Sequence, residues 1–283
     1  MIKYIFILLI GFLLPVTTGC TDTNLTHDIP LVPRPAHLVP GSGNYLFSDK
    51  TVFVVENEEQ AAVAASLISR FTNAAGFTPK LVVGATEKGD VRFVTDASLK
   101  SEAYSLEVSP EEIIVKASGD KGFFYALQTI RQLLPASIER ESLSDKKEKW
   151  SIPAMNVQDE PRFGFRGLLL DPVRCFIPKE NVLRIIDCMA MLKINKLHFH
   201  LTDDNGWRIE IKKYPLLTEF AAWRTDANWK TWWNGGRKYL RFDEPGASGG
   251  YYTQDDIREI VEYARQHFIT IIPEIEMPAH SEE

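Results

Sequence analysis

The sequence predicts a small α+β domain followed by an incomplete (β/α)8 TIM barrel with about three of its eight strands. Residues 41–150 mix several short strand patterns with two amphipathic helix patterns. From residue 165 onward, strand and helix patterns alternate. Each of the three strands in this second part ends in carboxylates, and barrel enzymes build their sites at the carboxyl ends of strands.

The composition is that of an ordinary globular protein and argues against nucleic acid as a partner. Of the 283 residues, 45% are hydrophobic and 25% are charged, which allows a core of useful size. The net charge is −6, and no long basic run is present to neutralise phosphates.

The first 20 residues read as an export signal. Lys3 precedes a short apolar run, and the small residues that follow lead to Gly19-Cys20. This ending resembles a bacterial lipoprotein cleavage site, with Thr17 departing from the usual apolar residue. We expect Cys20 to carry lipid, with plain secretion as the alternative. The protein is then exported to the periplasm or outer surface, and it meets the membrane only through its lipid anchor. Residues 21–40 are polar and then proline-rich, as expected of a tether and an extended entry.

The α+β domain is assigned to residues 41–150. Gly76 follows the first helix as a stop signal, and residues 136–150 read as a charged linker. The expected strands are 51–55, 91–95, 104–108 and 113–117, and the expected helices are 58–75 and 122–134.

The partial barrel is assigned to residues 151–283. Its expected strands are 167–170, 196–201 and 268–272, and its expected helices are 178–192 and 253–267, the second capped by Thr253 with Asp256 in its first turn. The turn after the first strand, 171–174, has no glycine, which argues against a dinucleotide-binding sheet. The 122 residues from Arg162 onward are too few for a barrel of about 250 residues, so we expect a truncated chain.

Two groups of residues carry candidate chemistry. His198 and His200 point to one face of their strand, which ends at Asp203-Asp204. Glu274 and Glu276 also share a face, and His280 follows them. Such a set can bind a metal, position a sugar, relay protons, or simply hydrogen-bond inside the barrel, and the residues alone leave these readings open.

Other features are weaker signals. Arg166, at the start of the first barrel strand, could clamp vicinal hydroxyls. Four tryptophans, at 223, 229, 232 and 233, lie in a long insertion, where they form either a satellite core or a surface that contacts sugars. Cys175 and Cys188 have no zinc-like spacing and are expected to be free thiols.

Several segments together resemble glycoside hydrolase family 20, the β-N-acetylhexosaminidases. The resemblance covers nearly all of residues 30–280. The segments that carry it are FRGLLLD (165–171), KLHFHLTDDNGWRIEIKKYP (196–215), YTQDD (252–256) and IPEIEMPAH (272–280), with EAYSLEV (102–108) and GFFYALQTIRQLL (122–134) upstream.

The resemblance implies an exo-acting enzyme that removes terminal β-linked N-acetylglucosamine or N-acetylgalactosamine from glycans, without metal or cofactor. In this family the acetamido oxygen of the substrate is the nucleophile, an exception among retaining glycosidases that gains from proximity. The catalytic Asp-Glu pair of the fourth strand is expected beyond residue 283, so the chain alone is expected to be inactive.

By the same resemblance, Arg166 holds sugar hydroxyls, Asp203 and His280 tune the general acid, and Glu276 belongs to the same supporting shell. Cys175 and Ala279 depart from the family pattern, which usually has His and Gly there. Two other functions stay open: a metal-dependent hydrolase on a similar barrel, and a non-catalytic carbohydrate-binding remnant.

Overall fold

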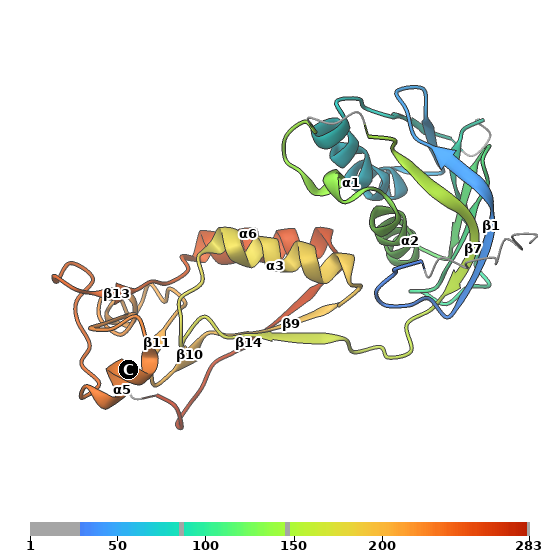
Figure 1. The fold of residues 1–283 in the computed structure, drawn as a ribbon. Helices are drawn as coiled ribbons and strands as arrows, with labels where there is room; N and C mark the ends of the chain where they lie inside the picture. The colour runs from blue at the N-terminus through green and yellow to red at the C-terminus, as the bar shows by residue number, and fades with distance from the viewer. Residues whose placement is uncertain (1–28, 85–87, 145–147, 282–283) are drawn as a thin grey trace, which may run out of the picture.

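The computed structural model describes residues 29–84, 88–144 and 148–281. It shows an α+β domain followed by a parallel β/α region with a large insertion (Figure 1). The proposed export signal, Cys20 and residues 21–28 of the expected tether lie outside the described residues. No helix among the described residues is long and apolar enough to cross a bilayer.

The first domain is built on a seven-stranded mixed sheet with two helices packed against it (Figure 1). The strand order is β1-β7-β5-β6-β4-β2-β3, with β2, β3, β4 and β6 parallel. Strands β4, β5 and β6 and helix α1 have their expected bounds. The elements are β1 (His37–Leu46), β2 (Val52–Val55), α1 (Glu58–Ala75), β3 (Lys80–Val83), β4 (Val91–Thr95), β5 (Tyr104–Val108), β6 (Ile113–Ala117), α2 (Asp120–Leu133), the 3-10 turn η1 (Ala136–Glu139) and β7 (Ser151–Asp159).

The expected domain boundary at residue 150 is wrong. Strand β7 pairs with β1 on one side and β5 on the other, so the first domain extends to Asp159. The end of the expected tether is also wrong, because β1 begins at His37. Prolines at positions 40 and 153 argued against strands in both segments. In the structure the β1–β7 register shifts beside Pro40, and a sheet tolerates proline at such a shift.

The second part contains three parallel strands in the order β14-β9-β8. Helices α3 and α6 lie together along one side of this sheet (Figure 1). Thr253 caps α6 through the expected capping box with Asp256. The elements are β8 (Gly167–Leu170), α3 (Lys179–Met191), β9 (Lys196–His200), α6 (Gln254–Gln266) and β14 (Thr270–Glu274).

A long insertion between β9 and α6 lies at the carboxyl end of the strands (Figure 1). It is closed where Ile209 and Tyr252 form a bridge, so its two ends meet. Its short elements are β10 (Thr202–Asp203), β11 (Gly206–Trp207), α4 (Leu216–Glu219), β12 (Trp223–Arg224), α5 (Trp229–Asn234) and β13 (Ser248–Gly249).

Two buried arginines hold the insertion against the rest of the chain. The guanidinium of Arg208 donates to the carbonyls of Val173, Ala222 and Gly250 at 2.6–2.9 Å. Burial, together with the nearby positive charge of Arg224, lowers the pKa of Arg208 to about 10. Arg224 donates to the carbonyls of Arg174 and Asn205 at 2.6 and 3.0 Å. Both arginines therefore pair with backbone carbonyls rather than with carboxylates.

Charged side chains join the two domains. Arg131 of α2 bonds Asp187 of α3 at 2.7 Å, and Arg70 of α1 bonds the same carboxylate at 2.7 Å. Lys193, which follows α3, is buried and bonds Asp159 at 2.9 Å. These contacts fix the α+β domain to the parallel region.

Candidate active site

The centre of the candidate site is a buried histidine between two carboxylates. His200 lies opposite Glu274 in the parallel register of β9 and β14. Its Nδ1 is 2.7 Å from Glu274 Oε2, and its Nε2 is 3.1 Å from Asp203 Oδ2. His198 also reaches Glu274 Oε2, at 2.8 Å, so the two histidines share a face as the alternation predicted.

Asp203 is the most enclosed acid of this group, with 4% of its side chain exposed. Besides His200, it contacts the guanidinium of Arg174 in a close ion pair. Its second oxygen is 3.4 Å from Nδ1 of His280. Asp203 therefore links the buried His200 to the exposed His280.

Glu276 and His280 lie at the open side of the site. Ligand atoms of Glu276, Glu274 and His200 lie within 4.8 Å of one another. His280 is 56% exposed, and its Nδ1 is also 3.5 Å from Asp204 Oδ2. The structure thus brings Asp203, Glu276 and His280 to one end of the sheet.

The pKa of Glu274 is lowered from its ordinary value of 4.5. Burial acts to raise it, but hydrogen bonds with His200 and Glu276 and the nearby histidine charges outweigh burial. Glu274 is therefore a carboxylate that holds His200 in place at neutral pH.

The expectation that Arg166 lines this site is wrong. Arg166 precedes β8, and its guanidinium donates to Glu102 at 2.9 Å and to the hydroxyl of Tyr125 at 3.0 Å in the first domain. Its backbone N–H donates to Asn195, which precedes β9. The residues from Asn195 to Leu201 span about 20 Å of strand, so Arg166 lies at the opposite end of the sheet from Asp203. Its role in the structure is to join the domains.

Arg174 occupies the position that Arg166 was expected to fill. It follows the carboxyl end of β8, and its Nη1 is 2.8 Å from Asp171 and 3.1 Å from Nε2 of His200. Its side chain is 36% exposed beside the buried Asp203, so a ligand can reach it from solvent. Its place just after the strand end, in Asp171-Pro172-Val173-Arg174, was the sequence signal that the prediction missed.

The arrangement can do two kinds of chemistry. A guanidinium offers planar donors to adjacent sugar hydroxyls. The chain Glu274–His200–Asp203–His280 can orient a proton donor or acceptor placed beside His280. Neither sugar binding nor proton transfer requires a residue from the other end of the sheet.

The same residues also form two groups with metal-ligand spacing. These are His200 with Glu274 and Glu276, and Asp203 with Asp204 and His280. Arg174 contacts both Asp203 and His200. The positive charge of its guanidinium would repel a metal ion bound by the same side chains. The geometry therefore favours a sugar-binding reading over a metal centre.

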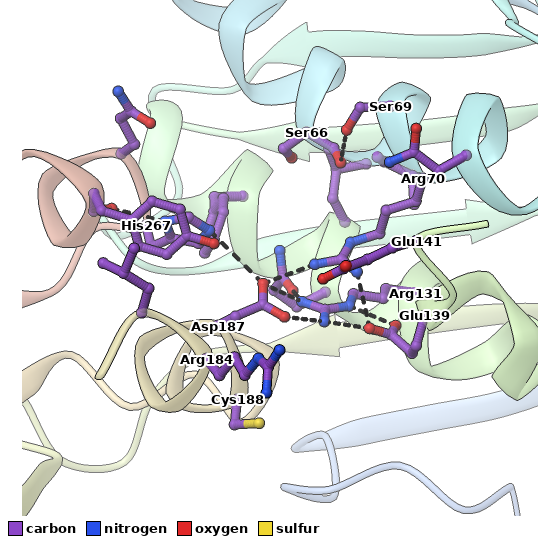
Figure 2. A pocket seen from close by; sticks show the side chains of 18 of the residues that line it. Ser66, Ser69, Arg70, Arg131, Glu139, Glu141, Arg184, Asp187, Cys188 and His267 are labelled. Carbon is purple, nitrogen blue, oxygen red and sulfur yellow. Dashed lines mark hydrogen bonds and ion pairs between the residues drawn. The ribbon is translucent and has the colours of Figure 1, made fainter. Parts of the chain in front are cut away.

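The cavity in Figure 2, of about 830 Å³, lies elsewhere. It opens between helices of the two domains, and Arg70, Arg131, Glu139 and Asp187 point toward one another inside it (Figure 2). Their charges are paired with each other, so this cavity is a domain junction rather than a second catalytic centre.

Both halves of the chain match models of known protein families. Residues 163–283 match the catalytic domain of glycosyl hydrolase family 20, and residues 28–160 match domain 2 of the same family. The second match ends at residue 160, in agreement with the observed end of β7.

Relatives and solved structures agree with these matches. The chain is 37% identical to a beta-hexosaminidase of Porphyromonas gingivalis over 89% of its length, and 32% identical to the N,N'-diacetylchitobiase of Vibrio harveyi, also over 89%. It superposes on a GH20 exo beta-N-acetylglucosaminidase of Vibrio harveyi, solved with N-acetylglucosamine, with a TM-score of 0.75 at 32% identity over 91% of the chain. A beta-N-acetylhexosaminidase of Bacteroides fragilis gives a TM-score of 0.69 at 29% identity over 90% of the chain.

The fold and these matches define a glycoside hydrolase with an α+β domain and a TIM-barrel region. The chain belongs to glycosyl hydrolase family 20. It spans 31% of the Porphyromonas relative and 27% of the Vibrio chitobiase, and 38% and 46% of the two solved chains.

Proposed function

We propose that this chain supplies the first part of an exo-β-N-acetylhexosaminidase that removes terminal β-linked N-acetylglucosamine or N-acetylgalactosamine from glycans. The observation that carries the proposal is the cluster of Arg174, Asp203, His200 and Glu274 at the carboxyl ends of β8, β9 and β14. The solved relative from Vibrio harveyi holds N-acetylglucosamine, the sugar class that we propose here.

In the proposed reaction, the acetamido oxygen of the substrate attacks the anomeric carbon, and a general acid protonates the leaving oxygen. Arg174 binds hydroxyls of the terminal sugar. Asp203 and His280 hydrogen-bond to the general acid and adjust its proton affinity. Glu274 fixes His200, and Glu276 lies beside them in the supporting shell. The acid and its neighbouring carboxylate come from a fourth strand, which the three described strands do not include. The three strands are then three of eight, and the 283-residue chain alone is inactive.

The test is expression of the gene extended past codon 283, assayed with an aryl N-acetyl-β-glucosaminide. An in-frame Asp-Glu pair and chromophore release are expected. Loss of the general acid slows such a reaction by about 10²- to 10⁴-fold, so the 283-residue chain should release none. Turnover by the purified 283-residue chain would contradict this reading, and a stop codon at that point would favour a carbohydrate-binding remnant.

A metal-dependent hydrolase is the second candidate, since six ligand-type side chains gather in two groups. Elemental analysis of the purified chain after zinc exposure and dialysis separates the two. Metal below stoichiometry is expected, and one or two tightly held ions per chain would support the second candidate.

We also propose that the protein is exported and anchored by lipid on Cys20. Labelling of cells with a tagged fatty acid should mark the protein, and Cys20→Ser should abolish the label. Unlabelled protein in the culture medium would favour plain secretion.

A further inference from the structure

The insertion carries two exposed tryptophans among its four. Trp232 is fully buried, and its indole N–H donates to the carbonyl of Lys238 at 2.9 Å. The indole N–H of Trp223 donates to the carbonyl of Thr218 at 2.8 Å. Trp229 and Trp233 are instead 40% and 39% exposed, and neither indole N–H has a hydrogen-bond partner within the described ranges. The tryptophans therefore divide into a satellite core and an exposed pair.

The exposed pair forms one surface, here named the insertion platform. Trp229 and Trp233 are four residues apart on α5, so their side chains are neighbours on the same face of that helix. Arg237 stacks on the Trp233 ring at 4.0 Å, and the Trp233 ring also meets that of Trp232 at 6.4 Å. These contacts hold the Trp233 ring in a fixed orientation, which lowers the entropy lost when a ligand stacks on it.

Contacts connect the insertion platform to the candidate site. Trp232 packs against Tyr239 with ring centroids 5.3 Å apart. The hydroxyl of Tyr239 donates to the backbone carbonyl of Asp204 in a short hydrogen bond. The carboxylate of Asp204 is 3.5 Å from Nδ1 of His280. A series of contacts therefore joins Trp232, which lies beneath the insertion platform, to the segments that carry Asp204 and His280.

We propose that the insertion platform binds the leaving-group side of the substrate, namely the sugar units that follow the terminal N-acetylhexosamine. This inference rests on the proposed function and adds to it a preference for oligosaccharides over simple glycosides. Sugar rings present an apolar face that packs against exposed aromatic side chains. Continuity with the site favours a glycan over a protein partner for this apolar surface.

The test compares two probes, N-acetylglucosamine and the β-1,4-linked trisaccharide of the same sugar. Saturation-transfer NMR and titration on the 283-residue chain give both affinities, and they detect weak binding. We expect the trisaccharide to bind about tenfold more tightly than the monosaccharide. The double variant Trp229→Ala/Trp233→Ala should lose that difference and keep its affinity for the monosaccharide. Circular dichroism checks that the variant is folded.

Phe163→Ala is the matched control, because Phe163 is 65% exposed at the other end of the strands. It should change neither affinity. An unchanged trisaccharide affinity in the double variant would contradict the proposed role of the insertion platform but not the proposed function. Equal losses for both sugars would also contradict that role, since the tryptophans would then act through the terminal-sugar site. A wild-type chain that binds neither sugar contradicts both proposals.

Discussion

Asp187→Asn tests whether the charge cluster in Figure 2 holds the two domains together. The Asp187 carboxylate accepts from Arg131 and Arg70, each at 2.7 Å, and so links α3 to both helices of the first domain. Burial acts to raise the pKa of Asp187, but the hydrogen bonds and charge of Arg131 outweigh it and hold that pKa below 3.8. The substitution keeps the side-chain shape and removes the charge.

The magnitude follows from the burial of Arg131, whose side chain is 4% exposed. Removal of one partner of a buried ion pair destabilises a protein by about 3–5 kcal/mol. Arg131 keeps a second partner, Glu139, at 2.7 Å, so we expect the lower end, about 3 kcal/mol. For a chain of this size, that loss lowers the melting temperature by roughly 6–12 °C.

The assay is thermal unfolding followed by near-ultraviolet circular dichroism at neutral pH. Glu262→Gln is the control, because Glu262 pairs with Arg265 on the exposed side of α6 and should leave the melting temperature unchanged. A shift of Asp187→Asn no larger than that of the control would refute the reasoning. It would mean that apolar contacts alone hold the domains together.

Three further predictions follow from the geometry. Arg208→Met leaves three buried carbonyls without their donor and should destabilise the chain by about 3–5 kcal/mol in urea unfolding; a loss below 1 kcal/mol would show that water replaces the guanidinium. Burial holds the pKa of His267 below 6.5, so the stability it contributes is complete above pH 6.5 and is lost as the pH falls toward the folded-state pKa. His267→Gln should flatten the melting temperature between roughly pH 7.5 and 5, and an unchanged pH profile would contradict this assignment. Arg174→Ala should weaken N-acetylglucosamine binding by about tenfold or more in NMR titration. Arg166→Ala should instead lower stability by about 2 kcal/mol and leave that affinity unchanged, and the reverse result would favour Arg166 as the sugar-binding arginine.

Local sequence patterns were sufficient for most elements. The apolar spacing of residues 58–75 with Gly76 behind it predicted α1 within its observed bounds, because helix periodicity and capping are local properties. The carboxylates after three successive strands predicted a site at one end of the sheet. Parallel strands in a sheet bring their carboxyl ends together, so this part of the site followed from strand direction alone.

Contacts between residues far apart in the sequence could not be predicted from local patterns, because only the tertiary structure brings those residues together. Strand β7 was missed because it is defined by its pairing with β1 and β5. Even β5, the closer of the two in sequence, lies more than 40 residues before β7, and the local sequence of β7 does not encode that pairing. Arg166 and Arg174 lie eight positions apart and are chemically identical, so composition cannot separate them. Strand β8 lies between them and sends one to the domain junction and the other to Asp203. The sequence determined the kinds of side chain available, and the direction of one four-residue strand determined which arginine faces the candidate site.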